Sequence, residues 1–116
     1  TALLNVATEL LRQLPLRAEA FNVPFDADLD ALLPQASSAM RRIDSGDGVL
    51  VMTDLYGASP SNLAKRLATL GTPVRRVSAL SLPMLLRVMN YPEQGLQELA
   101  ATAAAGTRNG AIIDDA

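Results

Sequence analysis

The sequence predicts an α/β fold, a doubly wound and mainly parallel sheet with helices on both faces. Short apolar runs rich in β-branched residues alternate along the 116 residues with longer segments whose apolar residues recur every three or four positions. The clearest short run, residues 49–52, follows a glycine-containing turn and leads through polar residues into a new helical pattern. Because a βαβ unit joins two parallel strands through a helix, this alternation indicates a parallel sheet within one domain, residues 1–116.

The composition argues against several classes of partner and site. The chain has no cysteine and no histidine, which excludes disulfides and thiolate metal sites. Its net charge of −2 and scattered basic residues argue against nucleic acid binding. No apolar run approaches the roughly 20 residues that span a bilayer.

The first helix is predicted over residues 2–14 and ends before Pro15. A sheet of this type normally begins with a strand, so a helix that starts directly after Thr1 indicates that the first strand is missing and that the domain is N-terminally incomplete. Alternating residues over 16–23 predict a short edge strand, which Pro24 ends.

The second helix carries an apolar stripe from Leu29 to Ile43, and either Asp26 or Asp28 can cap it. Pro34 falls within its first turns. Residues 45–48 have the composition of a turn, and they lead into the buried central strand at residues 49–52.

The third helix is predicted to begin with Ser59 as its N-cap and Pro60 at its first position. Gly71 marks its end, and Pro73 precedes a further strand over residues 74–79.

The fourth helix repeats this pattern, with Ser81 as cap and Pro83 in its first turn. Its apolar residues cover almost the whole circumference, so it is either deeply buried or covered by a second subunit. An alanine-rich last helix is expected over residues 97–107, ended by Gly106, and residues 111–113 suffice for a terminal strand.

The predicted ligand site is the segment from Asp54 to Ser61. Ligands of open parallel sheets bind beyond the carboxyl ends of the strands, where a helix N-terminus offers unpaired N–H groups to an anion. Asp54 stands at the end of the central strand, and Gly57 permits close approach of the backbone. Taken alone, Asp54 can also be a turn cap and Ser59 a helix cap.

Two motifs give the chain a family resemblance. TDLYGASPSN at residues 53–62 and LSLPMLLRVMNY at residues 80–91 resemble the IIA components of the mannose/fructose class of the bacterial sugar phosphotransferase system. The resemblance extends over the chain in its order of elements. It implies a doubly wound sheet, a cytoplasmic location and a homodimer that exchanges a C-terminal strand between subunits.

The resemblance also implies an activity. Members of this class are phosphotransferase components that take a phosphoryl group from a histidine phosphocarrier protein onto their own histidine and pass it to a IIB component, without a metal or other cofactor. Membrane contact is indirect, through the transporter. The histidine lies between the first strand and first helix, a position that here falls before Thr1.

Residue roles follow by position in the motifs. Asp54 matches the aspartate that orients the active imidazole, and Ser59 matches the serine at the start of the next helix. The resemblance assigns phosphate binding to the segment Gly57, Ala58 and Ser59. Ala58 replaces a more usual glycine, and Ser81 replaces a common asparagine.

Partner or interface contacts are assigned to Tyr56, Leu82, Pro83 and Met84. Tyr56 either shields the site or fills a groove, and Met84 is core or interface filler. One alternative function is a histidine-less regulatory or protein-binding module on the same fold. Another is a small Rossmann-like domain that binds a phosphorylated metabolite at the Ser59 helix.

Overall fold

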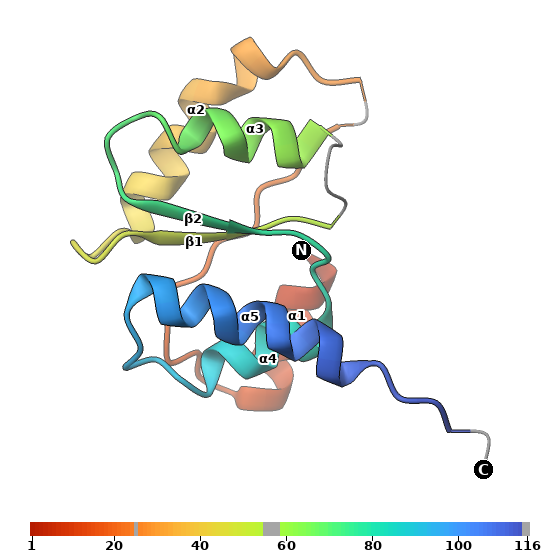
Figure 1. Ribbon diagram of the computed structural model, residues 1–116. Helices are drawn as coiled ribbons and strands as arrows, with labels where there is room; N and C mark the ends of the chain where they lie inside the picture. The colour runs from red at the N-terminus through yellow and green to blue at the C-terminus, as the bar shows by residue number, and fades with distance from the viewer. Residues whose placement is uncertain (25, 55–58, 115–116) are drawn as a thin grey trace.

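The computed structural model describes residues 1–24, 26–54 and 59–114. In these residues the chain is a mixed α/β domain in which helices lie on both sides of a small parallel sheet (Figure 1), so the predicted α/β class is confirmed. Its elements, in chain order, are α1 (Ala2–Leu11), α2 (Leu29–Ile43), β1 (Val49–Met52), α3 (Ser59–Leu67), β2 (Val74–Val77), α4 (Leu82–Met89) and α5 (Leu96–Gly110).

The sheet of the described residues has two strands, not the wider sheet that the sequence predicts. β1 and β2 run parallel, with Val49 opposite Val74 and Met52 opposite Val77. α3 connects them, which is the βαβ unit expected from the central motif.

Alternate side chains of the strands pack into the two helical layers on opposite faces of the sheet. Val49, Val51 and Val74 join the apolar cluster of α2 and α3. Leu50 and Met52 pack instead on the opposite side of the sheet, where α4 and α5 lie (Figure 1). Burial on both faces explains why β1 reads as a continuous apolar run.

The expected strand at residues 16–23 is irregular chain in the structure. Leu16, Ala18, Phe21 and Val23 are half-buried against the core clusters. An alternating pattern indicates that one side of an extended segment is buried. It does not show that the segment is hydrogen-bonded to a neighbouring strand, so an extended coil can have the same pattern.

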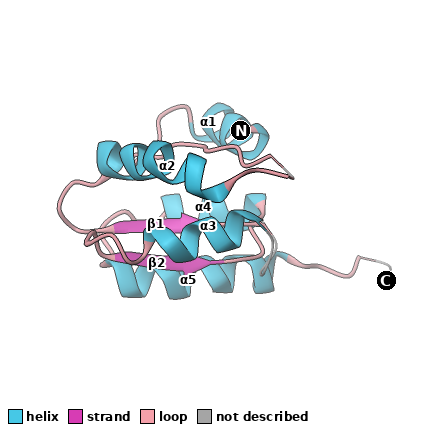
Figure 2. Cartoon of the chain, turned by 90° about the horizontal axis from the view of Figure 1, so that it is seen from above, coloured by secondary structure: helices cyan, strands magenta, loops and turns pink. Residues whose placement is uncertain are grey.

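The expected terminal strand at residues 111–113 is also not formed. Ile112 and Ile113 are 77% and 87% exposed, on a segment that leads away from the helices (Figure 2). A strand needs a ladder partner, and no described part of the chain lies beside this segment to provide one.

Three helix ends differ from the prediction. α3 ends at Leu67, four residues before Gly71. α1 ends at Leu11, before Arg12, whose φ is 62°. α5 continues through Gly106 to Gly110, because Gly106 is a packing position: a Cβ there would lie 3.0 Å from the Cα of Met84 in α4. Its lack of a side chain permits the close approach of two helices and does not end α5.

The apolar circumference of α4 is covered within the chain. Met84 and Val88 pack with residues of α5, whereas Leu85 and Met89 pack with α1. The first of the two expectations for this helix, deep burial, is therefore the one the structure supports.

Candidate functional site

The carboxyl ends of the two strands are joined by backbone hydrogen bonds. The N–H of Thr53 donates to the oxygen of Val77 at 2.9 Å, and the N–H of Leu80 donates to the oxygen of Thr53 at 2.9 Å. The N–H of Ala79 donates to the oxygen of Asp54 at 3.0 Å. These bonds hold the loop after β1 against the loop after β2.

The same bonds explain why β2 ends at Val77 and not at Ala79. Ala79 has a φ of 66°, which leaves the extended region and turns its N–H toward Asp54. Asp54 is thus positioned through its backbone at the carboxyl edge of the sheet, and its side chain is exposed.

The two predicted catalytic positions lie at the ends of the described segments on either side of residues 55–58. Asp54 follows β1, and Ser59, half-buried, is the first residue of α3. The helix thus begins one residue earlier than predicted, with Pro60 still in its first turn, where its missing N–H removes no helical bond. Tyr56, Gly57 and Ala58 lie outside the described residues, so their roles stay predictions.

Ser81 anchors a small hydroxyl network behind this edge. Its Oγ accepts the N–H of Met84 at 3.2 Å, the predicted N-cap of α4. The hydroxyl of Thr107 in α5 donates to the oxygen of Ala79 at 2.9 Å and lies 2.9 Å from Ser81 Oγ. Serine therefore serves as the cap where the resemblance favours asparagine.

Thr107 is a positioning residue that the sequence did not indicate. It lies 28 positions after Ala79 and carries no local signal, since a threonine late in a helix is unremarkable in a sequence. Only the packing of α5 against α4 brings its hydroxyl to this loop.

The three other predicted partner residues differ in exposure. Pro83 is exposed and Leu82 is half-buried, whereas Met84 is completely buried. Met84 is therefore a core residue here, and of these three residues only Leu82 and Pro83 have exposed surface.

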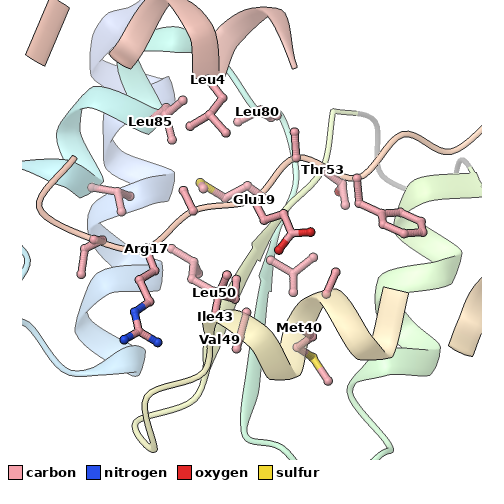
Figure 3. Close-up of a pocket in the computed structure, with 18 of the residues that line it drawn as sticks. Leu4, Arg17, Glu19, Met40, Ile43, Val49, Leu50, Thr53, Leu80 and Leu85 are labelled. Carbon is pink, nitrogen blue, oxygen red and sulfur yellow. The ribbon is translucent and has the colours of Figure 1, made fainter. Parts of the chain in front are cut away.

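A large pocket lies along the side of β1 that faces away from β2. Its volume is about 710 Å³, and helices of both layers line it together with residues 15–21 and residues 1–4 (Figure 3). Most of the lining is apolar, and Glu19 lies among these side chains, paired with Arg42 of α2. The hydrogen bond to Glu19 and the charge of Glu19 raise the pKa of Arg42 above its ordinary value.

The backbone of β1 has hydrogen-bonding groups directed toward this pocket. The N–H groups of Val49 and Thr53 bond to Pro73 and Val77, each at 2.9 Å. Because bonding direction alternates along a strand, the N–H and C=O groups of Leu50 and Met52 point the other way. Within the part of the chain that the structure describes, the pocket therefore combines a strand edge that has no neighbouring strand with apolar walls.

Metal and membrane features can be assessed over the described residues. Within ranges 1–24, 26–54 and 59–114, no three acidic side chains gather closely enough to hold a metal ion. No helix in these ranges has the length and apolarity needed to cross a bilayer.

The chain matches a known protein family. The family model described as PTS system fructose IIA component matches residues 1–104. The match includes β1, α3, β2 and α4, and with them the predicted site from Asp54 to Ser61.

Proposed function

The chain belongs to the family of PTS system fructose IIA components, and from this membership we propose that it is a phosphoryl carrier of a sugar phosphotransferase system. It accepts the phosphoryl group from a histidine phosphocarrier protein and passes it to a IIB component, in the cytoplasm. The observation that carries the proposal is the position of Asp54, whose backbone is held at the carboxyl edge of the sheet, five residues before the start of α3.

The acceptor histidine is proposed to lie before Thr1, because none of the 116 residues is histidine. We assign it to a loop that follows a further strand, paired with the outer edge of β1 in the large pocket. Two facts support this placement: Thr1 and Ala2 line the pocket, and so does Thr53, which directly precedes Asp54. A parallel strand in the pocket delivers its following loop to that same edge.

Phosphoryl transfer to this histidine then needs one carboxylate and a set of hydrogen-bond donors. A neutral imidazole nitrogen attacks phosphorus as the bond to the donor's imidazole nitrogen breaks, and the donor ring leaves neutral. Asp54 accepts a hydrogen bond from the other nitrogen of the acceptor ring, which fixes its tautomer and stabilises the positive charge that develops. The N–H groups of Gly57, Ala58 and Ser59, with the Ser59 hydroxyl, are proposed to receive the phosphoryl oxygens.

The test is phosphoryl acceptance by the complete gene product. The protein is incubated with phosphorylated histidine phosphocarrier protein, and its intact mass and phosphohistidine content are measured. We expect a phosphoryl gain that disappears when the histidine before Thr1 is replaced by alanine. A folded complete product that gains nothing overturns the proposal and favours the regulatory module.

A homodimer is a further part of the proposal. Its support is the exposed pair Ile112 and Ile113 on the extended segment after α5. Apolar side chains at the end of such a segment are stabilised when a second copy of the chain covers them.

A further inference from the structure

A second, smaller pocket lies at the carboxyl ends of the strands, between the sheet and the first turns of α3. Its volume is about 240 Å³. Among the residues that the structure describes, three hydroxyl-bearing residues, one arginine and two apolar residues line it: Thr53, Ser61, Ser78, Arg76, Ala64 and Val77. It is separate from the apolar pocket along β1, although Thr53 and Ala64 line both.

The strand register explains why one of two adjacent arginines reaches this pocket. Val74 packs into the cluster of α2 and α3, so Arg76, two positions later, lies on the same face of β2, opposite Val51. Arg75 alternates to the other face together with Val77, which packs toward α4 and α5. Arg75 carries the same charge at the adjacent position and is not among the residues that line the pocket.

The lining groups have the chemistry of an oxyanion site. Hydroxyls donate single hydrogen bonds, and a guanidinium presents a planar fork that matches the oxygens of a phosphate. No carboxylate is among the lining residues, and Asp54, which follows Thr53, is not one of them. In addition, Ser61 lies in the first turn of α3, where the helix dipole favours negative charge.

The polar side chains of this pocket are not engaged by the rest of the described chain. The two ion pairs of the described residues join Arg42 to Glu19 and Arg66 to Asp30, so neither uses Arg76. The side-chain hydrogen bonds among the described residues likewise leave out Ser61 and Ser78. Their donors are thus available to a ligand.

We propose that this pocket binds a phosphate group, either inorganic phosphate or a small phosphate monoester. Arg76 supplies the charge, and the hydroxyls of Thr53, Ser61 and Ser78 supply the remaining donors. The site adjoins the proposed transfer edge, because Thr53 precedes Asp54, but it makes no use of an acceptor histidine. It therefore goes beyond the proposed carrier function and does not depend on it.

The test is a titration of the complete gene product with inorganic phosphate and, separately, with glycerol 3-phosphate. Calorimetry measures affinity, and amide chemical shifts locate the site. We expect saturable binding with shifts at Thr53, Ser61 and Ser78. Tighter binding of one probe identifies free phosphate or a monoester as the ligand.

Two matched variants separate the pocket from general charge effects. Arg76→Gln is expected to weaken binding about tenfold or more, because it removes a charge-assisted hydrogen bond. Arg75→Gln changes the net charge equally and should leave the affinity within about twofold. Thermal unfolding of both variants checks that each remains folded, and Ser61→Ala provides a second pocket variant that keeps the charge.

Three results overturn the proposal: no saturable binding to the unmodified protein, equal weakening by Arg75→Gln and Arg76→Gln, or chemical shift changes located away from α3 and β2. The carrier function is distinguished by its own assay. Binding that depends on Arg76 in a protein that accepts no phosphoryl group supports the pocket and rejects the carrier, and the reverse pair of results rejects the pocket alone.

Discussion

Gly48 directly precedes the central strand and has a backbone conformation that residues other than glycine rarely adopt. Its φ is +92°, and a Cβ placed on it would lie 2.7 Å from the carbonyl oxygen of Pro73 and 2.7 Å from Cδ2 of Leu96. The oxygen of Pro73 cannot move freely, because it accepts the N–H of Val49 at 2.9 Å. We therefore expect Gly48→Ala to destabilise the domain strongly.

Gly46→Ala is a matched control that separates the cost of backbone strain from the cost of the steric collision. Gly46 lies in the same turn with a φ of +107°, but a Cβ there meets nothing within 4 Å. Both N–H groups bond to Oδ1 of Asp44, at 2.9 Å for Gly46 and 3.1 Å for Gly48. Gly46→Ala thus has the backbone strain alone, whereas Gly48→Ala has the strain and the collision.

The expected losses in the free energy of unfolding follow from the backbone strain and the steric collision. Left-handed backbone costs a residue with a Cβ about 1–2 kcal/mol, which is the whole expected loss for Gly46→Ala. Overpacking against a rigid neighbour adds about 1–3 kcal/mol, so Gly48→Ala should lose about 2–5 kcal/mol in total.

Urea unfolding followed by circular dichroism measures both free energies of unfolding. The difference between the two variants is the collision term alone. A difference below about 0.5 kcal/mol would refute the close approach of Gly48 to Pro73 and Leu96, because ordinary surface substitutions already vary by that amount.

Three further changes test the site and the assembly. Thr107→Val removes the hydroxyl that bonds to Ala79 and Ser81, and we expect a loss of about 1–2 kcal/mol in urea unfolding; unchanged stability would contradict the network. Asp54→Asn in the complete gene product should slow phosphoryl acceptance on the order of a hundredfold, measured by rapid quench, with an unchanged circular dichroism spectrum; acceptance at the original rate would remove Asp54 from the mechanism. Deleting residues 111–116, which include Ile112 and Ile113, should convert a homodimer to a monomer in light scattering, and a monomeric mass before deletion rejects the dimer.

The helix signals were predictable because their determinants are local. Asp28 caps α2 through the N–H of Asp30 at 3.0 Å, and Ser81 caps α4 through Met84, both within three residues of the cap. The central βαβ unit was predictable for the same reason, because the signals for its strands and its helix lie in consecutive segments of the chain. Such features need no knowledge of the rest of the fold.

The larger errors concern distant partners. Residues 16–23 and 111–113 have strand-like composition, but a strand exists only where another strand lies beside it. Gly106 resembles a helix end in the sequence, whereas its actual neighbour is Met84 of another helix. Arg76 and Arg75 are indistinguishable by composition, and only the register of β2 against β1 separates the arginine that lines the small pocket.

The unpaired edge of β1 links the fold to the proposed function and can be tested directly. In the structure, the N–H groups of Val49 and Thr53 are bonded to the β2 side, whereas those of Leu50 and Met52 face the large pocket. If a strand before Thr1 occupies that pocket, the amides of all four residues are protected from hydrogen exchange to a similar degree in the complete gene product.

Hydrogen exchange followed by NMR distinguishes the two edges residue by residue. We expect Leu50 and Met52 to exchange rapidly in the 116-residue chain and slowly in the complete product, while Val49 and Thr53 are protected in both and report that β1 itself is formed. Rapid exchange at Leu50 and Met52 in the complete product, with Val49 still protected, would leave the edge unpaired. A histidine before Thr1 would then lack the strand that brings it to Asp54, and the carrier mechanism would lose its geometric basis.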